Sequence, residues 1–280
     1  MKCVKCCAKL ELTSYKEDAE IIEGTLDCTK CGLAYPIINS VAILWNDFAG
    51  YLSNRPKLGG ELFLAAKSAQ IKSMVKSALS KAAKSQDLSI IEKRWTGIYR
   101  NNQRSKFYGV IKKAIPDSGL ALEHGCSIGI MTRYVAQKSK QAFGIDKSFY
   151  SILEAKKSNR KNLDYFVADS MEHPFGKTKF DLVLGLNLFE LIEPKGLIKI
   201  FAGQIQKCGT LILSDPYDYE RGTKTVREPL YENTIREELA KLGFVISNNT
   251  KKPSHIRWNL TLHKRASLQY LVDLVVARKS

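Results

Sequence analysis

Residues 120–137, LALEHGCSIGIMTRYVAQ, give the clearest indication of the fold. The first of them, Leu120 to Glu123, have strand character and run into a turn that holds Gly125, Ser127 and Gly129. Apolar residues then recur at helical spacing. Glycines between a strand and a helix let the backbone approach a ligand and let the helix pack close to the strand. The pattern predicts the first strand–turn–helix unit of a parallel sheet.

The rest of the chain repeats this alternation of short apolar runs and helical periodicity, which is typical of α/β folds. An acidic residue about 20 residues beyond such a glycine loop is placed to bind ribose hydroxyls, and Asp146 stands 23 residues after Glu123. Two strands, at residues 243–248 and 270–279, are expected to finish the chain, with a loop from Asn249 to Gln269 between them. The other predicted strand ends lie at Asp169 and Ser170, near Asn187, and at Asp215.

This ordered set of acids resembles the class I S-adenosylmethionine-dependent methyltransferases over residues 90–280. The resemblance implies a Rossmann-like sheet, parallel except for an antiparallel C-terminal strand, preceded by helices. Glu123, Gly125 and Gly129 match the first motif of that family, and Ser127 stands where a middle glycine is usual. The implied cofactor residues, which would bind the methionine part, the ribose, the adenine and the side of the transferable methyl, are Glu123, Gly125, Ser127, Gly129, Asp146, Asp169, Ser170 and Asn187.

Two C-x-x-C pairs lie in the first 31 residues, Cys3 with Cys6 and Cys28 with Cys31. Thiolates are soft ligands and a structural zinc ion takes four of them in a tetrahedron, so the spacing predicts a Zn²⁺ site. Four thiolates would leave no position for water, which favours a structural role. Cys7 is expected to be a bystander.

Residues 26–45, LDCTKCGLAYPIINSVAILW, resemble the zinc-ribbon proteins related to the activator subunit of tRNA methyltransferases. The pattern is C-x-x-C-G-x-x-Y-P-I followed by a short apolar strand, and the first cysteine pair matches as well. The resemblance implies a module that docks onto a methyltransferase or onto its RNA.

The run SDPYDYE, residues 214–220, ends the fifth strand of the predicted sheet. Acids and phenols at this edge face the substrate side of such a crevice, so Asp215, Tyr217 and Asp218 are the candidate catalytic residues. The run also resembles methyltransferases that act on histidine-derived amines, which implies binding of a cationic or imidazole nitrogen. The alternative is an ordinary turn at the end of a strand. Trp258 would line the same pocket or anchor its loop.

The formal charge of +16 is unevenly distributed. Residues 1–50 carry 5 basic and 7 acidic side chains, residues 51–113 carry 14 and 3, and residues 114–280 carry 25 and 18. In the middle segment, the helical stretch from Leu62 to Gln86 combines an apolar stripe with lysines on its other faces. A second helical stretch, from Trp95 to Tyr108, mixes basic residues with aromatics, a composition that suits RNA. The alternative is a pair of helices over the cofactor site with lysines in solvent.

Together these patterns predict a zinc ribbon in residues 1–50, a basic helical linker or lid in residues 51–113 and a methyltransferase domain in residues 114–280. The expected activity is methyl transfer to RNA or the translation machinery. Two alternatives stay open: a methyltransferase of a small amine, and an inactive zinc-ribbon protein that binds RNA or activates an enzyme. No apolar run approaches the roughly 20 residues of a membrane span and no signal peptide is recognisable, so a cytoplasmic location is expected. Nothing in the sequence indicates an oligomeric state.

Overall fold

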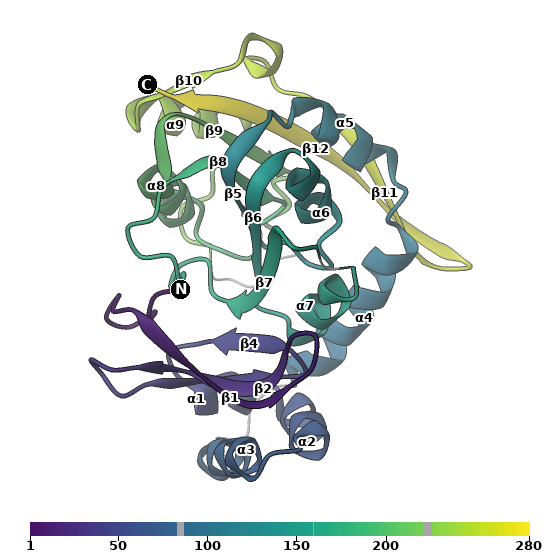
Figure 1. The fold of residues 1–280 in the computed structure, drawn as a ribbon. Helices are drawn as coiled ribbons and strands as arrows, with labels where there is room; N and C mark the ends of the chain where they lie inside the picture. Colours follow the sequence, from purple (N-terminus) through teal and green to yellow (C-terminus); the bar gives the residue numbers. More distant parts are fainter. Residues whose placement is uncertain (83–86, 159, 221–225) are drawn as a thin grey trace. The chain divides into compact units, whose positions relative to one another are not determined.

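The computed structural model describes residues 1–82, 87–158, 160–220 and 226–280. The chain divides into two compact units, whose segments alternate along the sequence (Figure 1). The first unit comprises Met1–Gly97, Ile145–Ser158 and Tyr165–Gly176. The second unit comprises Ile98–Gly144, Asn159–Asp164 and Lys177–Ser280.

The first unit begins with an antiparallel meander, in which each strand pairs with the next. Its last strand, β4, also pairs in parallel with β7, from Ala42 opposite Phe166 to Leu44 opposite Ala168. All four residues of β4 are buried, so this strand is covered on both faces. The strands of this unit are β1 (Leu10–Glu17), β2 (Ile21–Cys28), β3 (Ala34–Ile38), β4 (Val41–Leu44) and β7 (Leu163–Ala168).

Helices complete the first unit, and one expected helix is divided in two. The stretch predicted from Leu62 to Gln86 is interrupted at Ala66–Ser68, and its residues 83–86 lie outside the described part of the chain. The break has a tertiary cause, because the buried carboxylate of Glu23 accepts the backbone N–H groups of Lys67 at 2.5 Å and Ser68 at 2.7 Å. The helices are α1 (Phe48–Ser53), α2 (Pro56–Ala65), α3 (Ala69–Lys81), α4 (Leu88–Asn101) and α7 (Phe149–Lys156).

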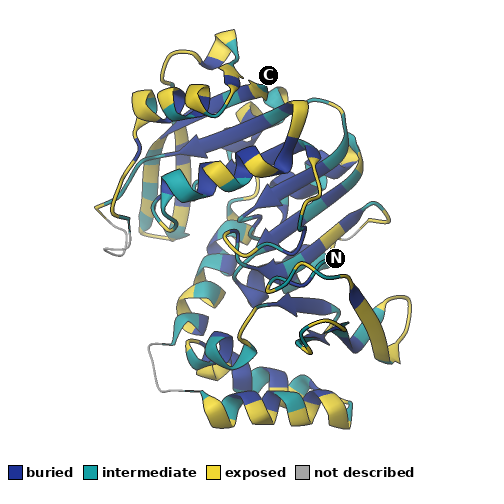
Figure 2. Cartoon of the chain, turned by 90° about the vertical axis from the view of Figure 1, so that its left-hand side faces the viewer, coloured by how far each residue is buried: buried dark blue, intermediate teal, exposed yellow. Residues whose placement is uncertain are grey.

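The second unit is built on a sheet with the strand order β6-β5-β8-β9-β12-β10. Strands β5, β8 and β9 run parallel, whereas β12 is antiparallel to both β9 and β10. These strands are the buried centre of the unit (Figure 2). They are β5 (Ser118–His124), β6 (Ser139–Asp146), β8 (Phe180–Leu186), β9 (Ile205–Asp215), β10 (Phe244–Ile246) and β12 (Ala266–Lys279).

This sheet confirms the predicted α/β fold, parallel with an antiparallel C-terminal strand. Helix α6 contacts β5, α8 contacts β8 and β9, and α9 contacts β10 and β12. The unit's helices are the end of α4, α5 (Lys106–Ala114), α6 (Ile130–Gln137), α8 (Pro194–Gln204), α9 (Glu232–Lys241) and the short 3₁₀ helix Asn248–Thr250.

The predicted loop from Asn249 to Gln269 is wrong. Strand β11 (Ile256–His263) occupies its centre and pairs with the first half of β12, from Ile256 opposite Val272 to His263 opposite Ala266. In β11, Trp258 and Leu260 are buried and Arg257, Asn259 and Thr261 are exposed, a two-residue period that indicates a strand with one covered face. Among the described residues, no helix is both long and apolar enough to cross a bilayer.

Candidate functional site

The glycine loop between β5 and α6 has the tight backbone that its sequence predicts. Gly125, Ser127 and Gly129 all have left-handed φ angles, of 63°, 48° and 70°, and Gly129 is the N-cap of α6. Any Cβ at Gly125 would overlap the Cδ2 atom of Leu188, in the loop that follows β8. Glycine is therefore required here both by the backbone angle and by close packing. Ser127 adopts a conformation that costs a residue with a Cβ about 1 kcal/mol.

Glu123, at the end of β5, is a buried carboxylate with a satisfied oxygen. Its side chain is 3% exposed, and its Oε2 accepts the hydroxyl of Thr132 from α6. A buried acid is costly unless it is hydrogen-bonded. The bond from Thr132 holds this carboxylate at the base of the glycine loop.

The loops after β8 and β9 are joined at the same edge of the sheet. The backbone N–H of Asn187 donates to the carbonyl of Ser214 at 2.6 Å, and the Ser214 hydroxyl donates to Oδ1 of Asn187 at 3.0 Å. Asp215 is 1% exposed and accepts the N–H groups of Phe189 at 2.9 Å and Tyr217 at 2.8 Å. Burial raises the pKa of Asp215 to about 7 against these hydrogen bonds. This carboxyl group therefore fastens two loops together.

Tyr217 is tied to a second buried acid. Its hydroxyl donates to Asp273 at 3.0 Å, and Asp273 also receives both terminal nitrogens of Arg236, at 2.7 and 3.1 Å, and the N–H of Ser254 at 2.8 Å. Burial raises the pKa of Tyr217, and the charge of Asp273 raises it further. Of the three predicted catalytic residues, two are thus engaged inside the protein, and Asp218 is half-buried.

In the first unit, the acids predicted to bind adenosine lie close together. Oδ1 of Asp146 accepts the N–H of Ser148 at 2.8 Å, and the Ser148 hydroxyl caps α7. Asp169 accepts the N–H of Met171 at 2.8 Å and pairs with Lys147 at 3.1 Å. Carboxylates that follow parallel strands accept hydrogen bonds from ribose hydroxyls in this class of fold, so these two acceptors suit an adenosine.

The N-terminal helices of the same unit support these loops. The hydroxyl of Tyr51 in α1 donates to the carbonyl oxygen of Lys147 at 2.9 Å. Tyr51 is buried, and the guanidinium of Arg55 lies 4.2 Å from the centroid of its ring. Arg55 in turn binds both oxygens of Glu92, at 2.6 and 3.1 Å. Sequence reasoning missed Tyr51, Arg55 and Glu92, because single residues in a basic, helical stretch give no signal of a tertiary partner.

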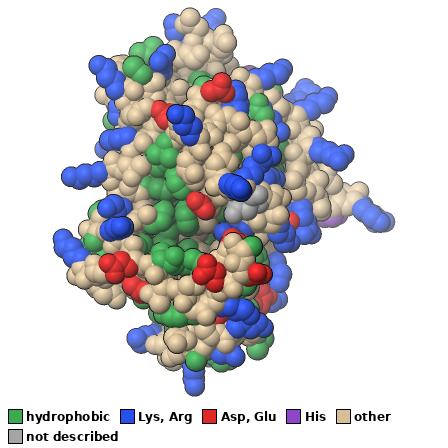
Figure 3. Space-filling model, viewed as in Figure 1, with side chains coloured by type: hydrophobic (Ala, Val, Ile, Leu, Met, Phe, Trp, Pro, Cys, Tyr) green, Lys and Arg blue, Asp and Glu red, His purple; other side chains and the backbone are tan. Residues whose placement is uncertain are grey.

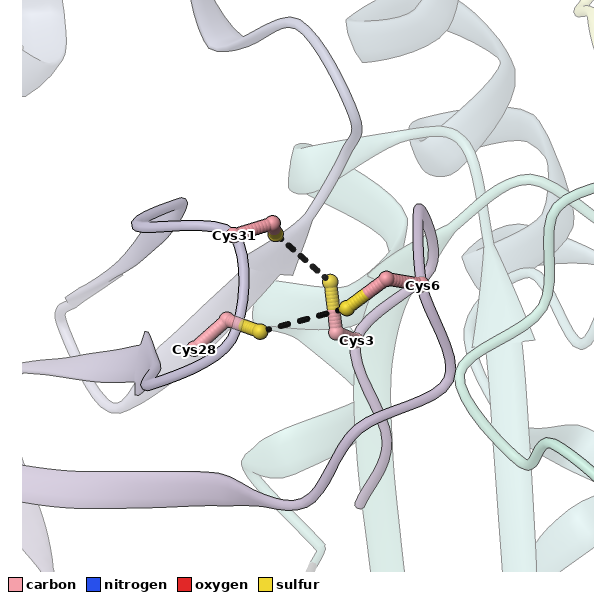
Figure 4. A group of neighbouring side chains, drawn as sticks. All are labelled: Cys3, Cys6, Cys28 and Cys31. Atoms are coloured by element: carbon pink, nitrogen blue, oxygen red, sulfur yellow. Dashed lines mark hydrogen bonds between the residues drawn. The ribbon is translucent and has the colours of Figure 1, made fainter.

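The four predicted cysteine ligands form one cluster, with all four Sγ atoms within 4.8 Å of one another. Figure 4 shows the two pairs pointing toward each other from separate loops, with Cys3 and Cys31 at 3.6 Å and Cys6 and Cys28 at 3.4 Å between Sγ atoms. A tetrahedron of thiolates around zinc has Sγ–Sγ distances of about 3.8 Å, so the cluster fits the ion. The Tyr35 hydroxyl lies 3.0 Å from Cys3 Sγ and is placed to orient it.

A surface hollow of about 600 Å³ lies at the opposite edge of the second unit's sheet, where β5, β8 and β9 begin. Lys140, Asp181, Cys208 and Arg278 are among its lining residues. No predicted site residue lines it. In the second unit, Glu123, Asn187 and Asp215 lie instead at the carboxyl ends of β5, β8 and β9, where α/β folds bind ligands.

Comparison with known proteins supports the fold. Residues 122–213 match the family described as a methyltransferase domain, whereas no curated protein matches the chain. A chain from the complex of the Haloferax volcanii Trm112 methyltransferase activator with a protein described as a methyltransferase is 12% identical, with a TM-score of 0.50 over 67% of this chain and 96% of its own. An S-adenosylmethionine-dependent methyltransferase from Mesorhizobium loti is 16% identical, with a TM-score of 0.49 over 63% and 99%. The chain therefore contains a Rossmann-like methyltransferase sheet, within which residues 122–213 match a methyltransferase domain.

Proposed function

We propose that this protein is an enzyme that transfers the methyl group of S-adenosylmethionine to RNA or to the translation machinery, with RNA as the favoured substrate. The observation that carries the methyltransferase part is the left-handed run of Gly125, Ser127 and Gly129 at the end of β5. This loop follows β5 in a sheet with the strand order β6-β5-β8-β9-β12-β10, in which β12 is antiparallel to β9.

Each candidate cofactor residue has a role in this proposal. Glu123, Gly125, Ser127 and Gly129 bind the methionine part, and Asn187 lies beside the transferable methyl. Asp146 accepts hydrogen bonds from the ribose hydroxyls, and Asp169 and Ser170 recognise the adenine edge. The satisfied bonds of Glu123 to Thr132 and of Asp146 to Ser148 support these roles, because they fix each carboxylate in one orientation.

The cofactor supplies a methyl group on a sulfonium centre, which is transferred by in-line displacement. The chain's own contribution is to align the acceptor and to exclude water. Asp215 and Tyr217 serve this purpose by holding the loops after β8 and β9, through the N–H of Phe189 and the carboxylate of Asp273. Asp218 is the candidate that contacts substrate.

The zinc ribbon, in this proposal, docks in cis onto the methyltransferase sheet. The parallel pairing of β4 with β7 supports this docking, because the ladder ends at Leu44 and Ala168, one residue before Asp169. The N–H of Lys2 also donates to the carbonyl of Pro174 at 2.9 Å. Zn²⁺ bound by Cys3, Cys6, Cys28 and Cys31 would keep the ribbon folded and so hold β4 in place.

RNA is favoured over a small amine for two reasons. A formal charge of +16 attracts polyanions. The amine alternative needs Asp215 or Tyr217 to bind a cationic nitrogen, whereas both side chains make internal hydrogen bonds.

Isothermal titration with S-adenosylmethionine tests the cofactor site. We expect Asp146→Ala to weaken binding at least about 10-fold, because the carboxylate makes charge-assisted hydrogen bonds of about 1.5 to 3 kcal/mol. The matched control is Asp117→Ala, since Asp117 is 87% exposed at the start of β5. Transfer of labelled methyl to total RNA then tests the substrate. A wild-type protein that binds no cofactor would leave the inactive RNA-binding or activator alternative.

A further inference from the structure

The two-stranded ribbon formed by β11 and the first half of β12 projects from the edge of the sheet that carries the predicted substrate site. In the pairing of β12 with β9, Asp273 lies opposite Asp215, the last residue of β9. The strands are antiparallel, so the seven residues before Asp273 in β12 extend about 24 Å past the carboxyl end of β9. Figure 1 shows this ribbon leaving the sheet as one continuous arm.

The ribbon is held rigidly by one covered face. Trp258 is 4% exposed and stacks on Phe107 of α5 at 5.1 Å and on Tyr270 at 5.8 Å between ring centroids. At the edge of β11, the side-chain amide of Asn102 donates to the carbonyl of Thr261 at 3.0 Å and accepts its N–H at 2.9 Å. These contacts fix the ribbon to the corner between α4 and α5.

The opposite face of the ribbon is exposed, polar and free of carboxylates. Residues 249–272 contain five Lys and Arg residues and no Asp or Glu. The turn between the strands is formed by Lys264 and Arg265, and both side chains are exposed. The exposed face of the strands carries Arg257, Asn259, Thr261, Ser267, Gln269 and Leu271.

The supporting corner has the same charge character. Residues 93–116 contain seven Lys and Arg residues and again no acid. Arg100, Arg104 and Lys106 are exposed there. Figure 3 shows Lys and Arg side chains gathered around the projecting ribbon at the right-hand side of the view. We define the basic ribbon as residues 256–272.

We propose that the basic ribbon is the RNA-docking surface of this protein, with Arg257, Lys264 and Arg265 on phosphates and the amides and hydroxyls of the exposed face on ribose hydroxyls and base edges. The inference rests on the proposed RNA substrate and places its main contact outside residues 51–113. A rigid, cationic surface without acids fits a folded RNA, because A-form helices are recognised across a wide minor groove by phosphate and 2′-hydroxyl contacts. Its position at the carboxyl end of β9 presents the RNA to the substrate edge.

The test compares two triple variants in fluorescence anisotropy with a labelled 20-base-pair RNA stem-loop, over a series of salt concentrations. The first, Arg257→Gln/Lys264→Gln/Arg265→Gln, removes the charges of the basic ribbon. The second, Lys140→Gln/Lys161→Gln/Lys207→Gln, removes three exposed charges at or just before the first residues of strands β6, β7 and β9. Both lose the same net charge. S-adenosylmethionine titration of each variant reports whether it is folded.

We expect the basic-ribbon variant to bind the RNA at least about 10-fold more weakly at 0.15 M salt and to lower the slope of log K against log salt by about 2 to 3, whereas the control keeps both values. Equal losses in the two variants would mean that only net charge matters and would overturn the basic ribbon as the docking surface. A DNA duplex of the same sequence that binds equally well would overturn the ribose contacts. Wild-type protein that binds no RNA, while still binding cofactor, would refute the RNA substrate itself.

Discussion

The hydroxyl of Tyr51 offers the sharpest test of whether the N-terminal helices act on the cofactor site. Tyr51→Phe removes one oxygen from a buried position and leaves the ring, and its packing under Arg55, in place. The carbonyl oxygen of Lys147 then loses the hydrogen bond that it accepts at 2.9 Å. Lys147 lies between Asp146, proposed to bind ribose, and the residues that begin α7, so a shift of its backbone moves the ribose-binding carboxylate.

The magnitude follows from the cost of an unsatisfied buried acceptor, about 1 to 3 kcal/mol, part of which water relieves. If about 1 to 2 kcal/mol is expressed as displacement of the Asp146 loop, the Kd for S-adenosylmethionine rises by about 5- to 30-fold. Titration calorimetry measures this Kd directly. Because the altered group does not contact the ligand, we expect thermal stability to fall in the absence of cofactor as well.

The matched control is Tyr15→Phe. Tyr15 lies in β1, and its hydroxyl is 3.2 Å from the hydroxyl of Thr25 in β2, within the antiparallel meander of the first unit. This variant also loses a tyrosine hydroxyl bond in the first unit, but not at a cofactor loop. If Tyr51→Phe bound the cofactor as tightly as Tyr15→Phe does, the supporting role of α1 would be refuted.

Three further predictions concern metal, acid stability and a buried acid. Purified protein should contain one zinc per chain by metal analysis, and Cys28→Ser should lose it while Cys7→Ser keeps it; zinc retained in Cys28→Ser would contradict the four-cysteine site. Burial raises the pKa of Glu23, but hydrogen bonds from the N-terminus of α3 outweigh it and lower the pKa. The ionised Glu23 carboxylate therefore contributes its full stability above the unfolded pKa of about 4.5. That stability is lost as the pH falls from this value through the lower pKa of the folded state. Glu23→Gln should cost about 2 to 4 kcal/mol near pH 7 in urea unfolding and less at pH 3, and a cost as small as that of exposed Glu17→Gln would argue against the capping role. In the folded protein, burial raises the pKa of Asp215 from 3.8 to about 7, so the folded state binds this proton more tightly than the unfolded state. The stability of the wild type should therefore fall relative to that of Asp215→Asn as the pH rises from about 4 to about 7. A constant difference in melting temperature over that range would disprove the shift.

The sequence predicted the parts of the fold that depend on local patterns. Strand β5, the glycine loop and α6 follow from apolar spacing and from the positive φ angles that Gly125 and Gly129 supply. The cysteine cluster follows from ligand spacing alone. In both cases, short sequence motifs are enough to predict the structure.

The parts that failed depend on distant residues. Glu23, about 40 residues earlier in the chain, accepts the backbone N–H groups at the break between α2 and α3. The helical periodicity from Leu62 onward therefore could not predict where the helix is interrupted. Strand β11 lies inside the predicted loop from Asn249 to Gln269, although the alternation of polar and apolar residues from Arg257 to Thr261 is that of a strand. The hydrogen bonds of Asp215 and Tyr217 inside the protein also join distant residues that no sequence motif connects, namely Phe189 in the loop after β8 and Asp273 in β12.

The parallel pairing of β4 with β7 has a consequence for how the chain is made. Strand β4 leaves the ribosome roughly 120 residues before β7, a delay of about 6 to 24 s at ordinary rates of synthesis. During that time the ribbon can bind zinc and fold, but the outer edge of Val41–Leu44, four apolar residues, has no partner strand. An unpaired apolar strand edge promotes aggregation, and this edge is covered only when β7, Leu163–Ala168, emerges and pairs with it. Nascent chains of this protein therefore depend on protection of one short apolar strand for nearly half of their synthesis.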